Sequence, residues 1–400
     1  MSRSPWLLAL VVAAVAALIG ISEIDKVSLQ PKADEGFYHY YTVAIAHKGP
    51  SVFPALLKEY LDNAPVRQHF PTPMRVAALT VDAIVFRCVG SAFCALQLIS
   101  LGSFLAVVVL VFFCVRFWFG NNIAFFTGLL LAVSPLWQAM ARRALSDSWV
   151  GFWMTAALWA LIALLVRKNR SLLHWAGLGL LFAIAILSRE SAVLLLPLGW
   201  ACLIFSPERD RKIFSGMAVA TAVALAVTFG IWRILFHDLT AVVHALNLTV
   251  QSVATNSYAQ QYGQGPWFRP LLDALLLSPG PVLLALTGFG FYFHDTAGTD
   301  AGRVIRLWVI VWIGTLVLSC FGTRNIRYLL FLEIPYRLGA VLFLSGLRTR
   351  WRRWGAWAAG VCFAVLVLGD LWLFYRFFVV NGLYDPVTTF LIYQYRMLPP

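Results

Sequence analysis

The chain has 400 residues, of which 60% are hydrophobic and only 12% are charged, with a formal net charge of +13. Soluble domains carry about 25% charged residues, so the surplus of apolar side chains is expected to face lipid. These values exclude a disordered chain, a secreted disulfide scaffold and a water-soluble α/β enzyme, and they predict an all-α polytopic membrane protein.

Apolar runs long enough to cross a bilayer recur along the whole chain. A spanning helix needs about 20 largely apolar residues. Residues 5–22 are followed by no clear small-residue cleavage site, so they are predicted to be a first anchor rather than a signal peptide. The runs 172–187 and 191–205 are short, and they are either a pair of short spans or partly re-entrant. About eleven spans are predicted, at 5–22, 92–115, 121–140, 149–166, 172–187, 191–205, 213–235, 271–293, 304–321, 328–346 and 354–379.

The loops between these spans alternate in basic character. The strongly basic set contains Arg3, Arg116, 167–170, 209–212, 303–306 and 348–353. Cytoplasmic loops carry an excess of Lys and Arg, so this set is predicted to be cytoplasmic. A multi-pass protein of the cell inner (plasma) membrane follows, with a cytoplasmic N-terminus. The net positive charge indicates contact with anionic membrane lipids, not with nucleic acid.

Five arginines fall on the opposite, outer side, at predicted helix ends: Arg142, Arg143, Arg189, Arg324 and Arg327. The charge rule disfavours such placements, so they need a physical reason. One reason is an anionic ligand, because a guanidinium grips phosphate with two hydrogen bonds. The alternatives are contact with outer lipid headgroups, or ion pairs with Asp147, Glu190 and Glu333.

The first outer loop, 23–90, is too long to be a simple connector. Apolar residues recur at helical spacing in three stretches between Phe37 and Phe86, and each stretch predicts an amphipathic helix lying in the membrane plane. Residues 1–380 are therefore predicted to form one transmembrane domain with this loop inside it. Residues 381–400 are predicted to be a short outer tail that forms an interfacial cap.

Two adjacent carboxylates, Asp34 and Glu35, precede the first of these amphipathic helices. Such a pair at a membrane surface suits a general base, a metal ligand or a helix N-cap. Asp34 is well placed as an N-cap, and capping is compatible with catalysis because it fixes the carboxylate.

Several short motifs follow in a fixed order. Asp34-Glu35 comes first, and an apolar stretch at 73–89 ends in Val89-Gly90. Ser134-Pro135 precedes Arg142-Arg143-Ala144-Leu145-Ser146-Asp147, Ser188-Arg189-Glu190-Ser191 precedes an apolar run, and Arg327-Tyr328-Leu329-Leu330 precedes Pro335. Over about residues 1–350 this order resembles the GT-C glycosyltransferases that use polyprenyl-phosphate sugars. Their nearest branch includes protein O-mannosyltransferases and the bacterial lipid A aminoarabinose transferase.

The resemblance implies a GT-C-like helical bundle that transfers a sugar from a polyprenyl-phosphate donor to a lipid, glycan or protein acceptor. Asp34 matches the catalytic carboxylate of the first loop, and Glu35 would position it or share a cation. The resemblance assigns the donor phosphate to the outer arginines, and further contacts to substrate-binding residues. The phosphate set is Arg327, Arg143, Arg142, Arg189 and Arg324, and the substrate set is Glu190, Tyr262 and Tyr328.

Some relatives use a divalent metal near the corresponding carboxylate, so a metal stays open here. Two adjacent acids alone do not make the ligand set of a hard cation, and no metal ligand is assigned. The loop 237–270, with glycines beside Tyr262, is either a mobile lid or an interfacial loop.

The competing hypothesis is a transporter or flippase for a lipid-linked or anionic substrate. Such proteins carry ionisable residues at mid-membrane and two related halves. Few charges here are central; Arg337, one turn after Glu333, fits an ion pair as well as a substrate site. The unusual charges gather at one face, which favours an enzyme that works there.

Overall fold

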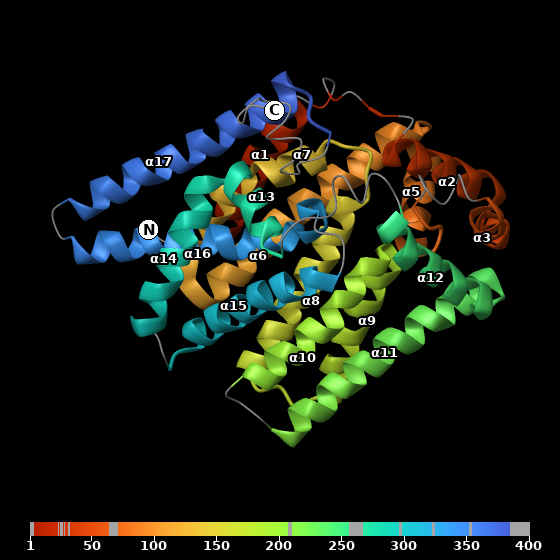
Figure 1. Cartoon of the computed structure of the whole chain (residues 1–400). Helices are drawn as coiled ribbons and strands as arrows, with labels where there is room; N and C mark the ends of the chain where they lie inside the picture. Colours follow the sequence, from red (N-terminus) through yellow and green to blue (C-terminus); the bar gives the residue numbers. More distant parts are fainter. Residues whose placement is uncertain are drawn as a thin grey trace.

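A computed structural model shows that the chain is all-helical over its described residues, with a long helical bundle and a smaller group of helices beside it (Figure 1). The described residues are 4–22, 24, 27, 29–30, 33–63, 71–206, 210–255, 267–295, 298–321, 325–351 and 354–384. This architecture confirms the predicted fold class.

Most of the smaller group comes from one stretch of chain between α1 (Pro5–Ser22) and the rest of the bundle. The smaller group is α2 (Asp34–Lys48), α3 (Phe53–Asp62), α5 (Val76–Val89) and, from later in the chain, α12 (Leu239–Thr255). The bundle contains α1, α6 (Ala92–Ala132), α7 (Pro135–Ala141), α8 (Asp147–Val166), α9 (Leu172–Ser188), α10 (Leu195–Phe205), α11 (Arg211–Phe236), α13 (Arg269–Leu277), α14 (Pro279–Asp295), α15 (Asp300–Leu318), α16 (Glu333–Arg350) and α17 (Gly355–Phe374). Short 3-10 turns η3 (Glu190–Leu194) and η6 (Ile326–Leu332) and a π-helical turn η7 (Tyr375–Val380) complete it.

Within the described residues, seven helices are long and apolar enough to cross a bilayer, or eight if the bent pair of α13 and α14 counts as one span. The predicted number was about eleven. The difference arises because the predicted spans 92–115 and 121–140 share the single helical stretch α6, the second continuing into the short α7, and because α9 and the η3–α10 stretch are shorter apolar helices. The predicted span 271–293 falls on the bent pair, whose two helices are bent by 119° relative to each other.

The stretch α6 is kinked at Gly120, between the predicted segments 92–115 and 121–140. Gly120 has φ +84° and ψ 175°, a conformation that other residues adopt only with strain. Helix α1 packs on both parts of α6: Trp6 contacts Phe113 before the kink, and Val12 lies against Gly128 after it. The second predicted segment, 121–140, is broken after Ala132, and Ser134 then caps α7 by accepting a hydrogen bond from the Trp137 N–H at 3.4 Å.

Small residues let two bundle helices approach closely. A Cβ on Gly288 of α14 would come 2.2 Å from the Gly339 carbonyl oxygen of α16. Close backbone approach through glycine is the usual way to pack helices in lipid, where dispersion contacts replace the hydrophobic effect.

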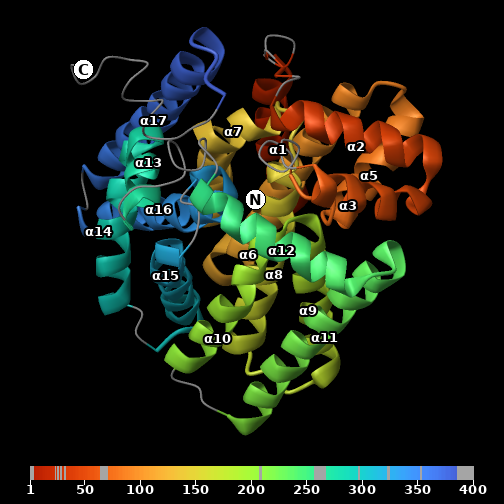
Figure 2. The same cartoon turned by 45° about the vertical axis from the view of Figure 1, so that its right-hand side comes forward.

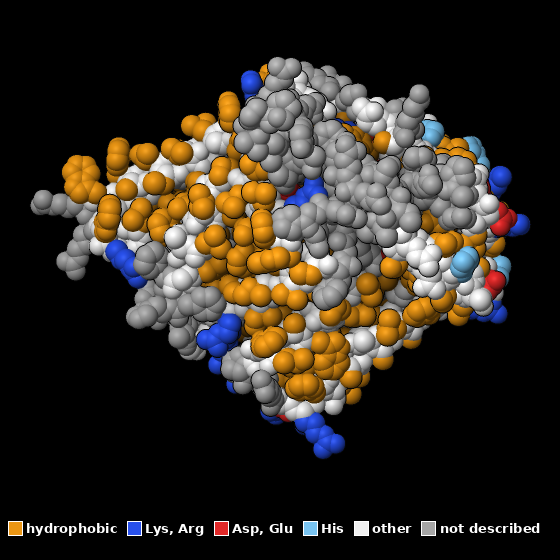
Figure 3. All heavy atoms as spheres, viewed as in Figure 1, with side chains coloured by type: hydrophobic (Ala, Val, Ile, Leu, Met, Phe, Trp, Pro, Cys, Tyr) orange, Lys and Arg blue, Asp and Glu red, His pale blue; other side chains and the backbone are white. Residues whose placement is uncertain are grey.

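The outer surface of the bundle is apolar over α17, α14, α15 and α10 (Figure 3). Helix α17 exposes a stripe of large side chains, with Trp357 67%, Leu368 65% and Trp372 62% accessible. Such a surface would aggregate in water but suits the hydrocarbon of a bilayer. The chain is therefore a membrane protein with several spans.

The three amphipathic stretches predicted in the first loop are helices α2, α3 and α5. Figure 2 shows α12 lying beside α3, and the Tyr60 and Thr249 hydroxyls are 3.2 Å apart across this contact. The Trp232 indole N–H donates to the Met74 carbonyl at 3.1 Å and so ties α11 to the start of α5. The position of these helices in the plane of a membrane remains a prediction.

Candidate active site

Six segments that are distant in sequence meet where the smaller group joins the bundle. They are the start of α2, the residue before α5, the link between α7 and α8, the link between α9 and η3, the start of η6, and residues 374–384. Each contributes charged or aromatic side chains to a connected set of contacts. The predicted site residues Asp34, Glu35, Arg142, Arg143, Arg189, Glu190, Arg327 and Tyr328 all belong to this set.

Asp34 forms an ion pair with Arg327, with 2.5 Å between Oδ2 and a guanidinium nitrogen. The Asp34 side chain is 30% exposed, whereas that of Arg327 is 3% exposed. The Asn325 side chain accepts a hydrogen bond from the Arg327 backbone N–H at 3.1 Å and caps the turn that presents the arginine. The expected N-cap role of Asp34 is wrong: Ala33 is the N-cap residue, and Asp34 lies in the first turn with its carboxylate directed to Arg327.

Glu35 is fully buried and binds the neighbouring links directly. Its Oε2 accepts a hydrogen bond from the Gln30 backbone N–H at 2.6 Å, and its Oε1 accepts one from the Ala144 N–H at 3.2 Å. The same Oε1 lies 3.5 Å from the Arg143 guanidinium. A buried carboxylate is stable only with such partners, so Glu35 fixes the link between α7 and α8 against α2.

Arg189 pairs with Asp147, which is fully buried at the start of α8. The Arg189 guanidinium also lies over the Tyr328 ring, 4.2 Å from its centre, and that of Arg327 lies 5.1 Å from the same ring. The Tyr328 ring therefore contacts two guanidinium groups, and its hydroxyl accepts a hydrogen bond from Arg327 at 3.1 Å.

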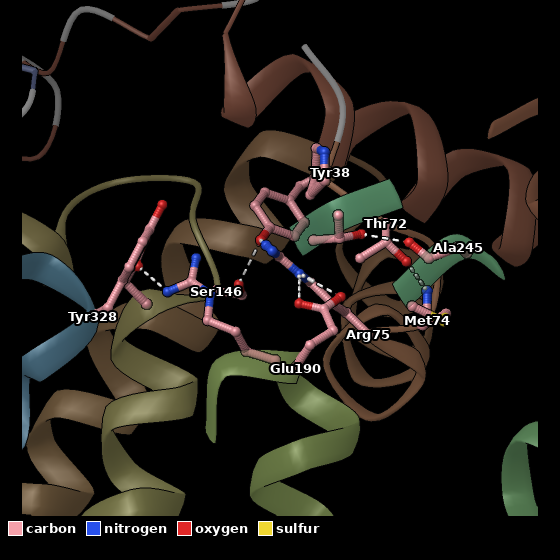
Figure 4. Close-up of polar contacts among 12 residues, drawn as sticks. Tyr38, Thr72, Met74, Arg75, Ser146, Glu190, Ala245 and Tyr328 are labelled. Carbon is pink, nitrogen blue, oxygen red and sulfur yellow. Dashed lines mark hydrogen bonds and ion pairs between the residues drawn. The ribbon is translucent and has the colours of Figure 1, made fainter. Parts of the chain in front are cut away.

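Arg75, which the sequence did not single out, provides the fourth ion pair. Its Nε lies 3.1 Å from the Glu190 carboxylate, and its other end donates a hydrogen bond to the Tyr38 hydroxyl (Figure 4). Ser146 donates to the same hydroxyl at 2.8 Å. Burial opposes the charge of Arg75, but Glu190 and the Tyr38 phenol hold the pKa of Arg75 above its ordinary value.

A signal for part of this group was present in the sequence. Tyr38 follows Asp34 by four residues, so both lie on one face of α2. Arg75 gave no such signal, because it lies before the helix and its partner Glu190 is 115 residues away.

Arg142 and Arg143 contact the last described part of the chain. Arg142 lies over the Phe374 ring at 4.7 Å and donates to the Phe378 carbonyl at 3.4 Å. Arg143 lies over the Tyr384 ring at 4.5 Å and donates to the Leu383 carbonyl at 3.0 Å. Residues 381–384, predicted to belong to an interfacial cap, thus pack on the arginines of the site.

A second buried cluster lies deeper in the bundle. Arg337 pairs with Glu333 at 2.5 Å and with Asp370 at 2.7 Å, which confirms the predicted Glu333–Arg337 contact. Ser134, the cap of α7, donates to Glu333 at 2.7 Å, and Ser278 donates to Asp370 at 2.6 Å. The cluster joins α7, α16, α17 and the bend between α13 and α14.

Two predicted site residues, Arg324 and Tyr262, lie outside the described residues, as do 256–266 of the candidate lid and 385–400 of the tail. Among the residues that the structure describes, no group of three or more His, Cys, Asp or Glu side chains could hold a metal ion. Asp34 and Glu35 each pair with an arginine, which is a poor setting for a hard cation. The described donor set therefore does not fit a divalent metal.

Taken together, each of the four site carboxylates is paired with an arginine: Asp34 with Arg327, Glu35 with Arg143, Asp147 with Arg189 and Glu190 with Arg75. Guanidinium groups that hold carboxylates can also bind phosphate, because both anions accept two parallel hydrogen bonds. The site is thus suited to an anionic ligand beside a partly exposed carboxylate.

Comparison with known proteins agrees with this architecture. The family model described as dolichyl-phosphate-mannose-protein mannosyltransferase matches residues 73–232, which include Arg75 and the links carrying Arg142, Arg143 and Arg189. No curated protein matches the chain by sequence.

Two solved structures share the fold. The ArnT of Cupriavidus metallidurans bound to undecaprenyl phosphate has a TM-score of 0.61 and 17% identity, over 97% of this chain and 74% of that one. The oligosaccharyltransferase of Archaeoglobus fulgidus, tethered with an acceptor peptide, has a TM-score of 0.58 and 13% identity, over 92% of this chain and 54% of that one. The chain thus spans about half the length of the archaeal enzyme. The resemblance to the GT-C group is confirmed, and the chain has the GT-C fold.

Proposed function

We propose that this chain is an integral membrane glycosyltransferase that moves a sugar from a polyprenyl-phosphate donor to a lipid, glycan or protein acceptor. The observation that carries the proposal is Asp34, a partly exposed carboxylate that is held by Arg327 among arginines at one end of a GT-C bundle. The family match and the lipid-phosphate complex of a protein with the same fold support this assignment.

Asp34 is the general base in this proposal. A donor phosphate competes with Asp34 for Arg327, because both anions fit the guanidinium. Once the phosphate occupies Arg327, the Asp34 carboxylate accepts the proton of the acceptor hydroxyl. The acceptor oxygen bonds to the anomeric carbon, the bond from that carbon to the phosphate oxygen breaks, and its electron pair leaves with the phosphate. Attack opposite the leaving group inverts the anomeric configuration.

The remaining predicted residues are proposed to bind the substrates or to position other side chains of the site. Positive charge fixed beside the leaving phosphate stabilises the transition state, and Arg327, Arg143, Arg142, Arg189 and Arg324 are proposed for this task. Glu35 is a positioning residue, because its full burial keeps it from the acceptor while its contacts hold Arg143. Glu190, Tyr328 and Tyr262 are proposed to contact the substrates.

The proposed site faces the outer side of the inner (plasma) membrane, with the N-terminus in the cytoplasm. The basic loops at 167–170, 209–212 and 348–353 support this orientation. Residues 1–380 form the proposed transmembrane domain, with 23–90 as its first outer loop, 237–270 as an outer loop and 381–400 as an outer tail.

The test compares wild type with Asp34→Asn in lipid nanodiscs. Both are incubated with radiolabelled polyprenyl-phosphate sugars and a crude membrane-lipid and protein acceptor fraction, and loss of donor is followed. Asp62→Asn is the matched control, since Asp62 is exposed and pairs with Lys58 on the surface of α3. The proposal is supported if wild type and the control consume the donor and Asp34→Asn does not. The molecule that receives the radiolabelled sugar then identifies the acceptor.

Equal turnover by wild type and Asp34→Asn would remove Asp34 from the chemistry. A wild type that neither binds polyprenyl phosphate nor consumes any donor would overturn the function itself and favour the transporter hypothesis.

A further inference from the structure

The segment that follows α17 crosses the arginine side of the site. We call residues 375–384, which comprise η7 and the four residues after it, the C-terminal strap. Leu383 is 1% exposed, and its carbonyl accepts the hydrogen bond from Arg143. Arg142 donates to the carbonyl of Phe378 within the same segment. The strap is therefore fixed to both arginines of the link between α7 and α8.

Tyr384, at the end of the strap, is directed into the site. Its ring lies 4.5 Å from the Arg143 guanidinium, the group that also contacts Glu35. Its hydroxyl is buried, and within the described part of the chain it has no hydrogen-bond partner. Leaving a buried hydroxyl without a partner is costly, so a ligand that accepts a hydrogen bond from it is favoured at this position.

The surroundings define which kind of group this is. The charges of Asp34, Arg327, Glu35 and Arg143 all act on the Tyr384 hydroxyl, so it lies in the same electrostatic environment as the proposed base and the proposed phosphate-binding arginines. Burial, followed by the charge of Asp34, raises the pKa of Tyr384. The phenol is thus neutral at physiological pH and available as a proton donor in a hydrogen bond, not as a base.

We propose that Tyr384 is a further substrate-binding residue, whose hydroxyl donates a hydrogen bond to a phosphate oxygen of the lipid-linked donor. The inference rests on the proposed function and adds a contact from a part of the chain that the sequence predicted to be an interfacial cap. Arg143 orients the ring through its π face, and the ring in turn keeps the guanidinium beside the ligand.

The experiment measures binding of undecaprenyl phosphate to wild type and to Tyr384→Phe in nanodiscs of zwitterionic lipid. The substitution removes only the hydroxyl and keeps the ring over Arg143. A hydrogen bond to a charged acceptor predicts a loss of affinity of roughly tenfold to a hundredfold. Tyr375→Phe is the matched control, because Tyr375 begins the same strap but is 52% exposed, and it should bind as wild type does.

Two further arms separate the outcomes. Repeating the titration in nanodiscs containing phosphatidylglycerol tests whether an ordinary anionic headgroup occupies the site: if that lipid abolishes the difference between wild type and Tyr384→Phe, the donor-specific contact is overturned. Thermal unfolding in detergent checks that Tyr384→Phe keeps the wild-type melting temperature.

Equal affinity of wild type and Tyr384→Phe, with wild-type donor turnover intact, would overturn the role of Tyr384 and leave the proposed function standing. A wild type that binds no undecaprenyl phosphate and consumes no donor would overturn both.

Discussion

Asp34 and Glu35 are adjacent in sequence, and the structure predicts opposite consequences for their amide variants. The Glu35 side chain is 0% exposed and accepts hydrogen bonds from two backbone N–H groups besides its ion pair with Arg143. Glu35→Gln leaves the Arg143 charge buried without its carboxylate and places an amide NH₂ against backbone donors. Removing one partner of a buried ion pair costs about 3 to 5 kcal/mol, so Glu35→Gln should be strongly destabilised.

Asp34→Asn should behave differently, because Asp34 is 30% exposed and its variant keeps an oxygen that can still accept from Arg327. A hydrogen bond to a charged group contributes about 1.5 to 3 kcal/mol, and partial exposure to solvent reduces the part that is lost. We therefore expect Asp34→Asn to lose activity while its stability changes by about 1 kcal/mol or less.

Thermal unfolding in detergent, followed by intrinsic Trp fluorescence, measures both variants beside Glu59→Gln. Glu59 is a suitable control because it accepts a hydrogen bond from Tyr40 in an exposed position on α3. The reasoning is refuted if Glu35→Gln has the melting temperature of the wild type. It is also refuted if Asp34→Asn has a lower melting temperature than Glu35→Gln.

Two other clusters give predictions of the same kind. Arg75→Lys keeps a charge beside Glu190 but cannot reach both Glu190 and Tyr38, so donor turnover should fall about tenfold at nearly unchanged melting temperature; an unchanged rate would show that the Tyr38 contact does not matter. Arg337→Met leaves Glu333 and Asp370 facing each other in the bundle and should lower stability by about 3 to 5 kcal/mol. The triple variant Arg337→Met, Glu333→Gln and Asp370→Leu should recover most of that stability in the same unfolding assay. If the triple variant stays as unstable as Arg337→Met, uncharged side chains cannot replace the charged network.

The sequence by itself indicated that the protein lies in a lipid bilayer, and it indicated where several helices form. A lipid environment removes the need for charged surface and requires every backbone group to be satisfied within its own segment, so composition alone indicated an all-helical membrane chain. The spacing of apolar residues between Phe37 and Phe86 predicted the helices α2, α3 and α5, because helical periodicity is a local property. The excess of Lys and Arg in alternate loops predicts that five arginines lie on the opposite face, because that rule depends only on the order of spans and charges along the chain, and this placement stays a prediction.

Only the tertiary structure decided which partners meet. Glu190 pairs with Arg75, a residue that the sequence did not single out, and Arg327 reaches Asp34 across 293 positions of sequence. Such contacts depend on how helix ends come together in space, which no local pattern encodes. The same holds for Tyr384: its place in the chain predicted an interfacial side chain, whereas packing of the strap on Arg143 buries its hydroxyl beside the site. Composition and periodicity specify elements and their solvent, but the pairing of buried charges is set by the packing that must satisfy them.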